Sequence, residues 1–236
     1  MTSDEKKLIL QNARSFFRNK IAKNHVKNLK KLSSLSAFDY NPFLLDYLAN
    51  FYSGNGSAES MARVLVYART LGTSINTSFG QNFQGFISKV LGAYGSAISG
   101  IDIEFFDHTD GRKKYCQIKL GPNTINKDDV KTISDHFGSV KNIARTNNLN
   151  IRMTDLVVGV MYGVEKDLSS FYLRLLKEHP IYTGSNFWKR LTGDDTFYDE
   201  LIAAFGQEAK KINGKKTLED TIKKLTEDIQ STLLVS

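Results

Sequence analysis

Apolar residues recur every three or four positions along most of the chain, which is the period of an amphipathic helix. Residues 4–32 show it first, with an apolar stripe that runs from Ile9 to Ile21. A second stripe carries six apolar residues between Phe79 and Leu91. The pattern predicts a mainly helical chain, with further helices from Asn41-Pro42 onward, from Ser57 to about Thr70, and over residues 127–145, 166–178, 185–192, 195–212 and 217–234.

The period changes to two in the middle of the chain, where strands are expected. Apolar and polar residues alternate in SGIDIEFFD (99–107) and in KKYCQIKL (113–120), and DHTDG (107–111) between them has the composition of a turn. This predicts a β-hairpin with one buried face, which includes Cys116, and one polar face. The apolar run LVVGVMY (156–162) predicts a third strand that is covered on both faces.

The order of these elements, helix, two strands, helix and strand, favours an α/β fold. We expect a mixed central sheet flanked by helices, with helical N- and C-terminal extensions. The expected segments are a helical N-terminal extension (1–71), a core that contains the sheet (72–165), and a helical C-terminal part (166–236) in the same globular unit.

Charge is distributed unevenly along the 236 residues, whose formal net charge is +7. Residues 1–31 hold nine Lys/Arg against two acids, whereas the remaining residues hold 23 of each. The excess suits a basic arm that meets phosphates, and equally a solvated helix face. One cysteine excludes an internal disulfide and a cysteine-based zinc cluster. The chain has no apolar run long enough for a membrane span and no recognisable secretory signal, so we expect a cytosolic protein.

Four polar residues of the hairpin have the chemistry of a nuclease. Alternation places Asp102 and Glu104 on one face of the first strand, and Gln117 and Lys119 share a face of the second. Carboxylate and amide oxygens bind Mg²⁺, which polarises a phosphodiester, and a lysine orients water or neutralises charge in the transition state. The spacing Asp-x14-Gln-x-Lys is that of PD-(D/E)xK nucleases, with Gln where Asp or Glu is usual. The same residues also suit an ordinary solvent-facing strand, so this pattern alone does not decide.

Longer stretches carry a family resemblance. NPFLLDYLANFYSG, LGTSINTSFGQNFQGFISKVLG and SGIDIEFFD with DGRKKYCQIKLGPNTINKDDV resemble type II restriction endonucleases that cut GGNCC-type sites, and more loosely the group that cuts RGGNCCY. The resemblance covers about residues 40–165, and TGSNFWKRLTGDDTFYDELI (183–202) is similar to a C-terminal block of these enzymes. It implies a restriction-endonuclease-like core of the PD-(D/E)xK superfamily in a QxK variant.

The resemblance also assigns roles to residues. Asp102 would be the metal-binding carboxylate, Gln117 the variant second ligand, and Lys119 the catalytic lysine, while the backbone carbonyl of Ile118 would complete a Mg²⁺ site. Gln117 is the departure from the family pattern, because an amide oxygen binds Mg²⁺ more weakly than a carboxylate. Two accessory candidates are Glu104, which could instead pair with Lys119, and Gln84 on the preceding helix, which could reach the water shell of the metal.

The loop GPNTINK (121–127) directly follows the predicted catalytic strand. Its polar side chains suit hydrogen bonds to phosphates or base edges, and the start of a helix favours phosphate. They serve equally well in turns and caps. The candidate DNA-binding residues are Asn123, Thr124, Asn126 and Lys127. The cations Arg112, Lys113 and Lys114 at the hairpin tip are either phosphate contacts or solvated charges.

We therefore expect a Mg²⁺-dependent type II restriction endonuclease of a restriction–modification system. Its substrate would be double-stranded DNA with a short GC-rich palindrome, and it would act as a homodimer because a palindrome matches a two-fold protein. Neither a nucleotide-cofactor motif nor a membrane role is expected. Two alternatives stay open: a modification- or structure-dependent nuclease on the same core, and a DNA-binding protein whose catalytic site has decayed.

Overall fold

The computed structural model describes residues 2–212 and 214–233, and its contacts divide them into two compact units. Unit 1 comprises residues 2–13 and 83–204, and unit 2 comprises residues 14–82, 205–212 and 214–233. The segment boundaries expected near residues 71 and 165 are not tested by this division and stay a prediction. No helix in the described ranges is both long and apolar enough to cross a membrane.

Unit 1 contains a four-stranded mixed sheet with the order β1-β2-β3-β4. Its strands are β1 (Ile103–Phe106), β2 (Lys113–Lys119), β3 (Leu156–Val160) and β4 (Ile181–Thr183). β1 and β2 form the predicted antiparallel hairpin, and β2, β3 and β4 run parallel. The expected mixed sheet with flanking helices is confirmed. β4 was not predicted, because three residues are too few to show an alternation.

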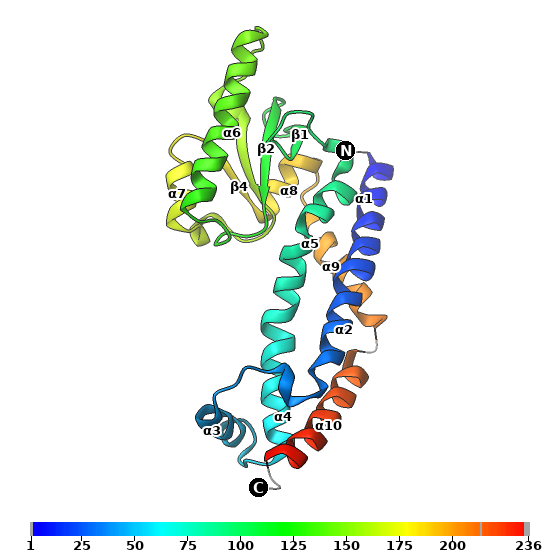
Figure 1. Cartoon of the computed structure of the whole chain (residues 1–236). Helices are drawn as coiled ribbons and strands as arrows, with labels where there is room; N and C mark the ends of the chain where they lie inside the picture. Colours follow the sequence, from blue (N-terminus) through cyan, green and yellow to red (C-terminus); the bar gives the residue numbers. More distant parts are fainter. Residues whose placement is uncertain (1, 213, 234–236) are drawn as a thin grey trace. The chain divides into compact units, whose positions relative to one another are not determined.

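Helices cover both faces of this sheet (Figure 1). α6 (Lys127–Thr146) and α7 (Ser170–Leu175) lie on one face, where Phe137 packs in a common core with Val158 of β3. α8 (Gly184–Thr192) lies on the other face, and the ring of Phe187 sits directly against the backbone of Gly159. The neighbouring Trp188 is fully buried and donates a hydrogen bond from Nε1 to the carbonyl of Met161, at 3.0 Å.

The two-layer cover changes the expected environment of β2. Its residues from Lys114 to Ile118 are all buried, although the alternation predicted only one buried face. The prediction was wrong because α6 covers the face that carries Tyr115 and Gln117. Only Lys113 and Lys119, at the two ends of the strand, reach solvent. Gln117 therefore lies on a covered face of an internal strand, and Lys119 lies at the end of that strand.

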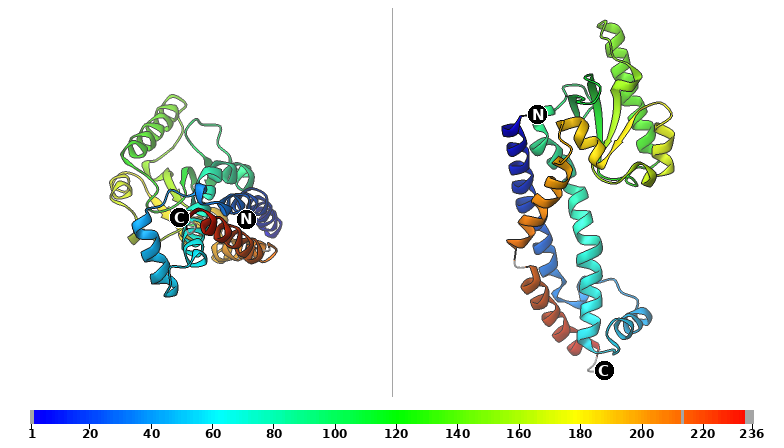
Figure 2. Two further views of the ribbon diagram at one scale, coloured as in Figure 1. Left: turned by 60° about the horizontal axis from the view of Figure 1, so that its bottom comes forward. Right: turned by 180° about the vertical axis from the view of Figure 1, so that it is seen from behind.

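Unit 2 is helical, and its core includes Leu29, Val66, Ile222 and Leu225. α10 (Gly214–Leu233) packs against α4 (Ala58–Tyr67), and α2 (Lys23–Lys30) also contacts α10 (Figure 2). Instead of one helix over residues 4–32, the structure has α1 and α2 joined by a π-helical segment, η1. The remaining helical elements of both units are α1 (Ser3–Phe16), η1 (Phe17–Ala22), α2 (Lys23–Lys30), α3 (Pro42–Ser53), α4 (Ala58–Tyr67), η4 (Ala68–Ser74), α5 (Ile75–Val90), α9 (Phe197–Lys210) and α10 (Gly214–Leu233), with single 3-10 turns η2 (Lys31–Ser33), η3 (Leu35–Ala37), η5 (Gly92–Tyr94), η6 (Met153–Asp155) and η7 (Glu165–Asp167).

Candidate active site

Asp102 lies one residue before β1 and is tied to β2 by its backbone and by its side chain. Its backbone N–H donates to the carbonyl of Cys116 at 3.0 Å, and its Oδ2 accepts a hydrogen bond from the backbone N–H of Ile118 at 2.6 Å. Burial raises the pKa of Asp102, while the hydrogen bond from Ile118 and the charge of Lys119 act in the opposite direction. The second oxygen, Oδ1, receives no hydrogen bond from the described residues.

Gln117 is nearly fully buried on the face of β2 that α6 covers. Its amide Nε2 lies 2.9 Å from Nδ1 of His136, which α6 supplies. The Oε1 atom has no hydrogen-bond partner within residues 2–212 and 214–233. The imidazole of His136 packs against the turn that precedes β1, where Gly100 has φ +82° and a Cβ atom would come within 2.3 Å of the ring. Gly100 is therefore required both by its backbone conformation and by the close approach of His136.

Lys119 ends β2 and is partly exposed. Its Nζ lies 3.2 Å from Oδ1 of Asp129 on α6. The other oxygen of Asp129 accepts the backbone N–H of Asn126 and so completes the capping box at the start of this helix. Lys119 also lies near enough to Asp102 for its charge to lower the pKa of that carboxyl. The lysine thus faces one carboxylate held by a helix cap and a second one that is half-buried.

The structure brings together Asp102, Gln117, the backbone of Ile118, and Lys119, the predicted catalytic and metal-binding set. It adds two residues that the sequence pattern did not single out, His136 and Asp129. These two are seven positions apart and so project from the same side of α6. A signal for them was available, because they flank the apolar stripe with which α6 faces the sheet.

The two accessory candidates have different surroundings. Glu104 does not pair with Lys119. Its Oε2 lies 2.6 Å from Nζ of Lys113, and Oε1 accepts a hydrogen bond from Ser96 Oγ at 2.5 Å. Burial would raise the pKa of Glu104, but these two partners outweigh it and lower the pKa. Gln84 is exposed on α5 and has no hydrogen bond to the residues of the site.

The donor atoms at Asp102 and Gln117 fit a hard divalent cation. No group of three His, Cys, Asp or Glu side chains that could hold a metal occurs among the described residues. The available ligands are instead one carboxylate oxygen and one amide oxygen, each without a hydrogen bond, and the backbone carbonyl of Ile118. Oxygen ligands of this kind suit Mg²⁺, which keeps several waters and needs few protein ligands.

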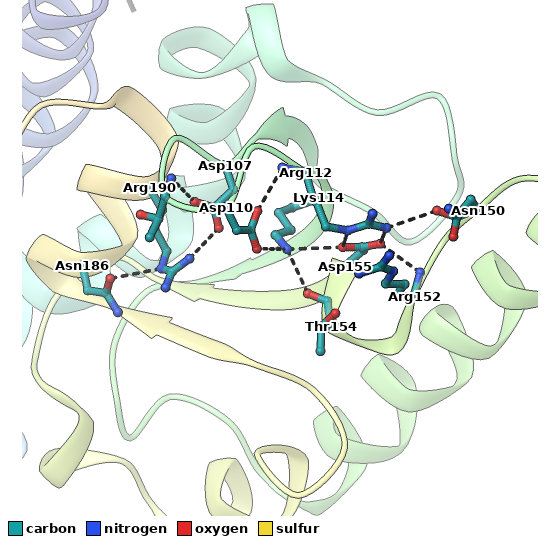
Figure 3. Close-up of polar contacts among 11 residues, drawn as sticks. Asp107, Asp110, Arg112, Lys114, Asn150, Arg152, Thr154, Asp155, Asn186 and Arg190 are labelled. Atoms are coloured by element: carbon teal, nitrogen blue, oxygen red, sulfur yellow. Dashed lines mark hydrogen bonds and ion pairs between the residues drawn. The ribbon is translucent and has the colours of Figure 1, made fainter.

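The tip of the hairpin, at the opposite end of β2, holds a dense ion-pair network (Figure 3). Lys114 is fully buried, and its Nζ contacts Asp110 Oδ2 at 2.6 Å and Asp155 Oδ1 at 3.3 Å. Arg112 forms a bidentate ion pair with Asp155, in which Nε lies 2.8 Å from Oδ1 and Nη2 contacts Oδ2. Burial would raise the pKa of Asp155, but the hydrogen bonds it accepts hold that pKa at about 2. Arg112 and Lys114 are therefore neither solvated nor unpaired: both form ion pairs with acids of the fold.

The predicted DNA-binding loop leads from β2 to α6. Asn123, Thr124, Asn126 and Lys127 are all exposed. Asn126 caps α6 through hydrogen bonds to the backbone of Asp128 and Asp129, and Thr124 Oγ1 donates to the carbonyl of Gly121 at 2.8 Å. Asn123 and Lys127 have no side-chain partner among the described residues. The loop is therefore ordered by two of the four candidates, which leaves the other two for a ligand.

Comparison with known proteins identifies the family. Residues 4–213 match the family model described as type II restriction endonuclease EcoO109I, which is most of the chain. No curated protein matches the chain at a significant level. The match includes the sheet, the Asp102–Lys119 site and α6, and it agrees with the mixed α/β architecture found in unit 1. The chain therefore belongs to the EcoO109I family of type II restriction endonucleases, enzymes that cut double-stranded DNA at specific sites.

Proposed function

We propose that this endonuclease hydrolyses phosphodiesters at a short GC-rich palindrome of the GGNCC type, that it depends on Mg²⁺, and that Asp102, Gln117 and Lys119 form its catalytic site. The observation that carries the proposal is the meeting of Asp102 with the QIK segment of β2, where Ile118 N–H holds the aspartate at 2.6 Å. Membership of the EcoO109I family supports the same reaction.

Each residue has a distinct role in this proposal. Asp102, Gln117 and the carbonyl of Ile118 would hold Mg²⁺ through oxygen atoms. When bound, the cation would polarise the scissile phosphate and stabilise the charge that develops on it. Lys119 places a positive charge beside Asp102, where it can orient the attacking water or offset charge in the transition state. Asn123 and Lys127 are the exposed residues best placed to hold the DNA backbone next to this site.

The first experiment is a cleavage assay on unmethylated phage DNA with Mg²⁺ or EDTA. Lys119→Ala is compared with Lys89→Ala, a control at an exposed lysine of α5. Discrete fragments that require Mg²⁺, disappear in Lys119→Ala and persist in Lys89→Ala would support the proposal. Fragment ends that map to a GGNCC-like sequence would establish the site. DNA binding without cleavage would instead favour a decayed catalytic site, and cleavage of methylated DNA alone would favour a modification-dependent nuclease.

We also propose that the enzyme is a homodimer that associates through α3. In Figures 1 and 2 this helix lies at the margin of the helices of unit 2. Phe43, Tyr47 and Phe51 follow one another at every fourth position and are 89%, 60% and 78% exposed. With Leu44, Leu48 and Tyr52 they expose roughly 700 Å² of mainly apolar surface, since an aromatic side chain alone offers about 150–250 Å². A standard interface buries about 800 Å² on each partner.

The surroundings of α3 favour a second copy of this chain over a different partner. Next to the aromatic ridge lies an apolar groove of about 350 Å³, lined by Leu44, Leu48 and Leu65 among others. A two-fold interface needs a surface that complements itself, and a ridge beside a groove meets this need. Asp46 is the single charged residue of α3, so two copies can approach without strong repulsion.

The dimer is tested by light scattering coupled to size-exclusion chromatography. The wild-type protein should have the mass of a dimer, and the double variant Phe43→Ser/Phe51→Ser that of a monomer. Exposed Leu173→Ser, in unit 1, is the control and should remain dimeric. A wild-type monomer at micromolar concentration would overturn the homodimer. A dimer that survives the double variant would overturn the role of α3.

A further inference from the structure

His136 lies at the catalytic site although no part of the proposed reaction uses it. Its Nδ1 is 2.9 Å from Nε2 of Gln117, and its ring fills the space that Gly100 leaves open beside Asp102. The imidazole is partly buried and lies close to Asp102. It therefore contacts the side chain that replaces the usual carboxylate and lies beside the carboxylate that remains.

The chemistry of a primary amide indicates what the contact between His136 and Gln117 does. Only the oxygen of Gln117 can bind a cation, because the amide nitrogen carries two hydrogens and has no free electron pair. A carboxylate has two oxygens, so it presents a cation-binding atom in either orientation. In the structure the amide nitrogen lies against His136 Nδ1, which can accept its hydrogen bond, and Oε1 is left without a partner among the described residues.

We infer that His136 is a positioning residue, which fixes the orientation of the Gln117 amide so that Oε1 is presented to the divalent cation. This inference rests on the proposed function, since it concerns the metal site of that reaction. It explains how a QxK sequence can serve where a carboxylate is usual. The amide oxygen of Gln117 is a weaker ligand than a carboxylate, but less affinity is lost when the amide is already held in its binding orientation.

The test is a double-mutant cycle between His136→Ala and Gln117→Glu, read out as Ca²⁺ and Mn²⁺ binding by isothermal titration calorimetry. With Gln117 present, His136→Ala should weaken ion binding about 10-fold or more, the usual effect of losing a residue that orients a metal ligand. In the Gln117→Glu background the same change should weaken it less than about 2-fold, because either carboxylate oxygen can serve. His136→Asn, whose Oδ1 can accept from Nε2, should restore most of the binding.

Each other outcome overturns the inference. An equal loss in both backgrounds would mean that His136 only fills space against Gly100. Unchanged binding in His136→Ala would mean that the amide orients without help. If the wild-type protein binds neither ion but Mg²⁺-dependent cleavage persists, the Gln117 site is not the metal site, although the nuclease assignment stands. If cleavage is also absent, the proposed function itself fails.

A second, independent observation concerns a polar cavity in unit 2. It has a volume of about 380 Å³ and lies where α2 and η2 meet η4 and α5. Two cations, Lys31 and Arg69, line it together with four hydroxyl residues, and its lining includes no carboxylate. The hydroxyl residues are Thr73, Ser74, Thr77 and Ser78.

Three side chains around this cavity lack a protein partner among the described residues. Lys31 and Arg69 form no ion pair with a described residue, whereas Arg18 and Arg63 in the same unit pair with Glu208 and Glu219. Ser78 is 4% exposed, and its Oγ has no hydrogen-bond partner in the described part of the chain. Positive charge and hydroxyl groups in a lining that holds no carboxylate suit an anion with several oxygens.

The geometry points to a phosphate-binding site in this cavity. Its occupant is a phosphate group, either from the backbone of DNA held by the enzyme or from free phosphate. The DNA form would give unit 2 a contact with the substrate apart from the catalytic site. It would also use part of the positive charge that residues 1–31 concentrate at this end of the sequence.

The test compares Lys31→Ala/Arg69→Ala with Lys20→Ala, an exposed lysine of unit 2 that does not line the cavity. If DNA is the ligand, the slope of log binding constant against log salt should fall by about 1–2 in the double variant, since each lost phosphate contact removes about 0.9. Lys20→Ala should change this slope less. If free phosphate is the ligand, calorimetry with inorganic phosphate should show wild-type binding that the double variant loses, with DNA binding unaltered. No difference in either assay would overturn the site, whether or not the enzyme cuts DNA.

Discussion

β2 carries a lysine near each end, and the two lysines lie in opposite environments. Lys114 is fully buried and contacts Asp110, Asp155 and the carbonyl of Thr154. Lys119 is partly exposed, and its Nζ has one ion-pair partner among the described residues, Asp129 Oδ1 at 3.2 Å. The carboxylates differ in the same way, since the pKa of Asp155 is about 2 and that of Asp102 is raised. The comparison shows that one strand can hold the same residue types fully paired at one end and sparsely paired at the other.

The two ends of β2 carry similar polar residues, but they differ in how many of the polar atoms have a hydrogen-bond or ion-pair partner. At the hairpin tip each buried acid among the described residues pairs with a cation, so no buried charge there is left uncompensated. At the end proposed as catalytic, Oδ1 of Asp102 and Oε1 of Gln117 stay without partners in the described part of the chain. Polar groups that the protein leaves unsatisfied are the ones available to a ligand.

The largest expected effect is that of Asp102→Asn. We expect cleavage to fall about 10³-fold or more, because the carboxylate that we propose as a Mg²⁺ ligand is lost. The unfolding midpoint at pH 7 should rise at the same time. The folded pKa of Asp102 lies above its unfolded value, so folding favours the protonated form and the charged form at neutral pH is a cost. A variant that is both inactive and less stable at pH 7 would contradict this account.

At the other end of β2 we expect Lys114→Met to lower the free energy of unfolding by about 3 kcal/mol. This is the lower end of the range for breaking a buried ion pair, because Arg112 still pairs with Asp155. Lys119→Met is the matched control and should cost less than about 1 kcal/mol, since its pair is partly exposed. Urea unfolding followed by circular dichroism measures both. Equal losses for the two lysines would remove the contrast between the two ends.

A smaller effect concerns acid stability. The pKa of Asp155 is lowered from 3.8 to about 2 in the fold, so its contribution to stability is present above pH 3.8 and is lost as the pH falls toward 2. Asp155→Asn should therefore be less stable than the wild type at pH 6, and the gap should narrow between pH 4 and pH 2. Thermal unfolding across this range gives the measurement. A gap that stays constant with pH would show that the charge of Asp155 is not the cause.

The smallest effect is expected for Lys113→Ala. Its partner Glu104 lies 2.6 Å away, but Lys113 is 45% exposed, and such pairs contribute about 0–1 kcal/mol. Salt should reduce this contribution further. Calorimetric unfolding at low and high salt tests it, with Glu104→Gln as the reciprocal variant. A loss above about 2 kcal/mol would place this pair with the buried network instead.

Much of unit 1 was predictable because its patterns are local. The alternation in residues 99–107 and 113–120 predicted the β1–β2 hairpin, and the apolar run at 156–162 predicted β3. The cap at Asn126 was also evident, and its capping box is present. These features depend on neighbours in the sequence, and the EcoO109I match confirmed the fold class that they indicated.

What the pattern missed depends on contacts between distant segments. The burial of Lys114 requires Asp155, which is 41 residues away, and no local pattern indicates such a pair. His136 belongs to the site through a contact with Gln117, 19 residues before it. The π-helical segments η1 and η4 were not expected either, because an extra residue per turn changes an apolar stripe only slightly.

The single tryptophan offers a way to observe one unit alone. Trp188 is buried in the layer between α8 and the sheet, and its indole is fixed by the carbonyl of Met161. Since the chain has one Trp and it lies in unit 1, intrinsic fluorescence emission reports the unfolding of that unit. The helical far-ultraviolet signal comes from both units. Two melting curves from one sample, one from tryptophan fluorescence and one from circular dichroism, would therefore show whether the sheet unit and the helical unit lose their structure in a single transition or in two.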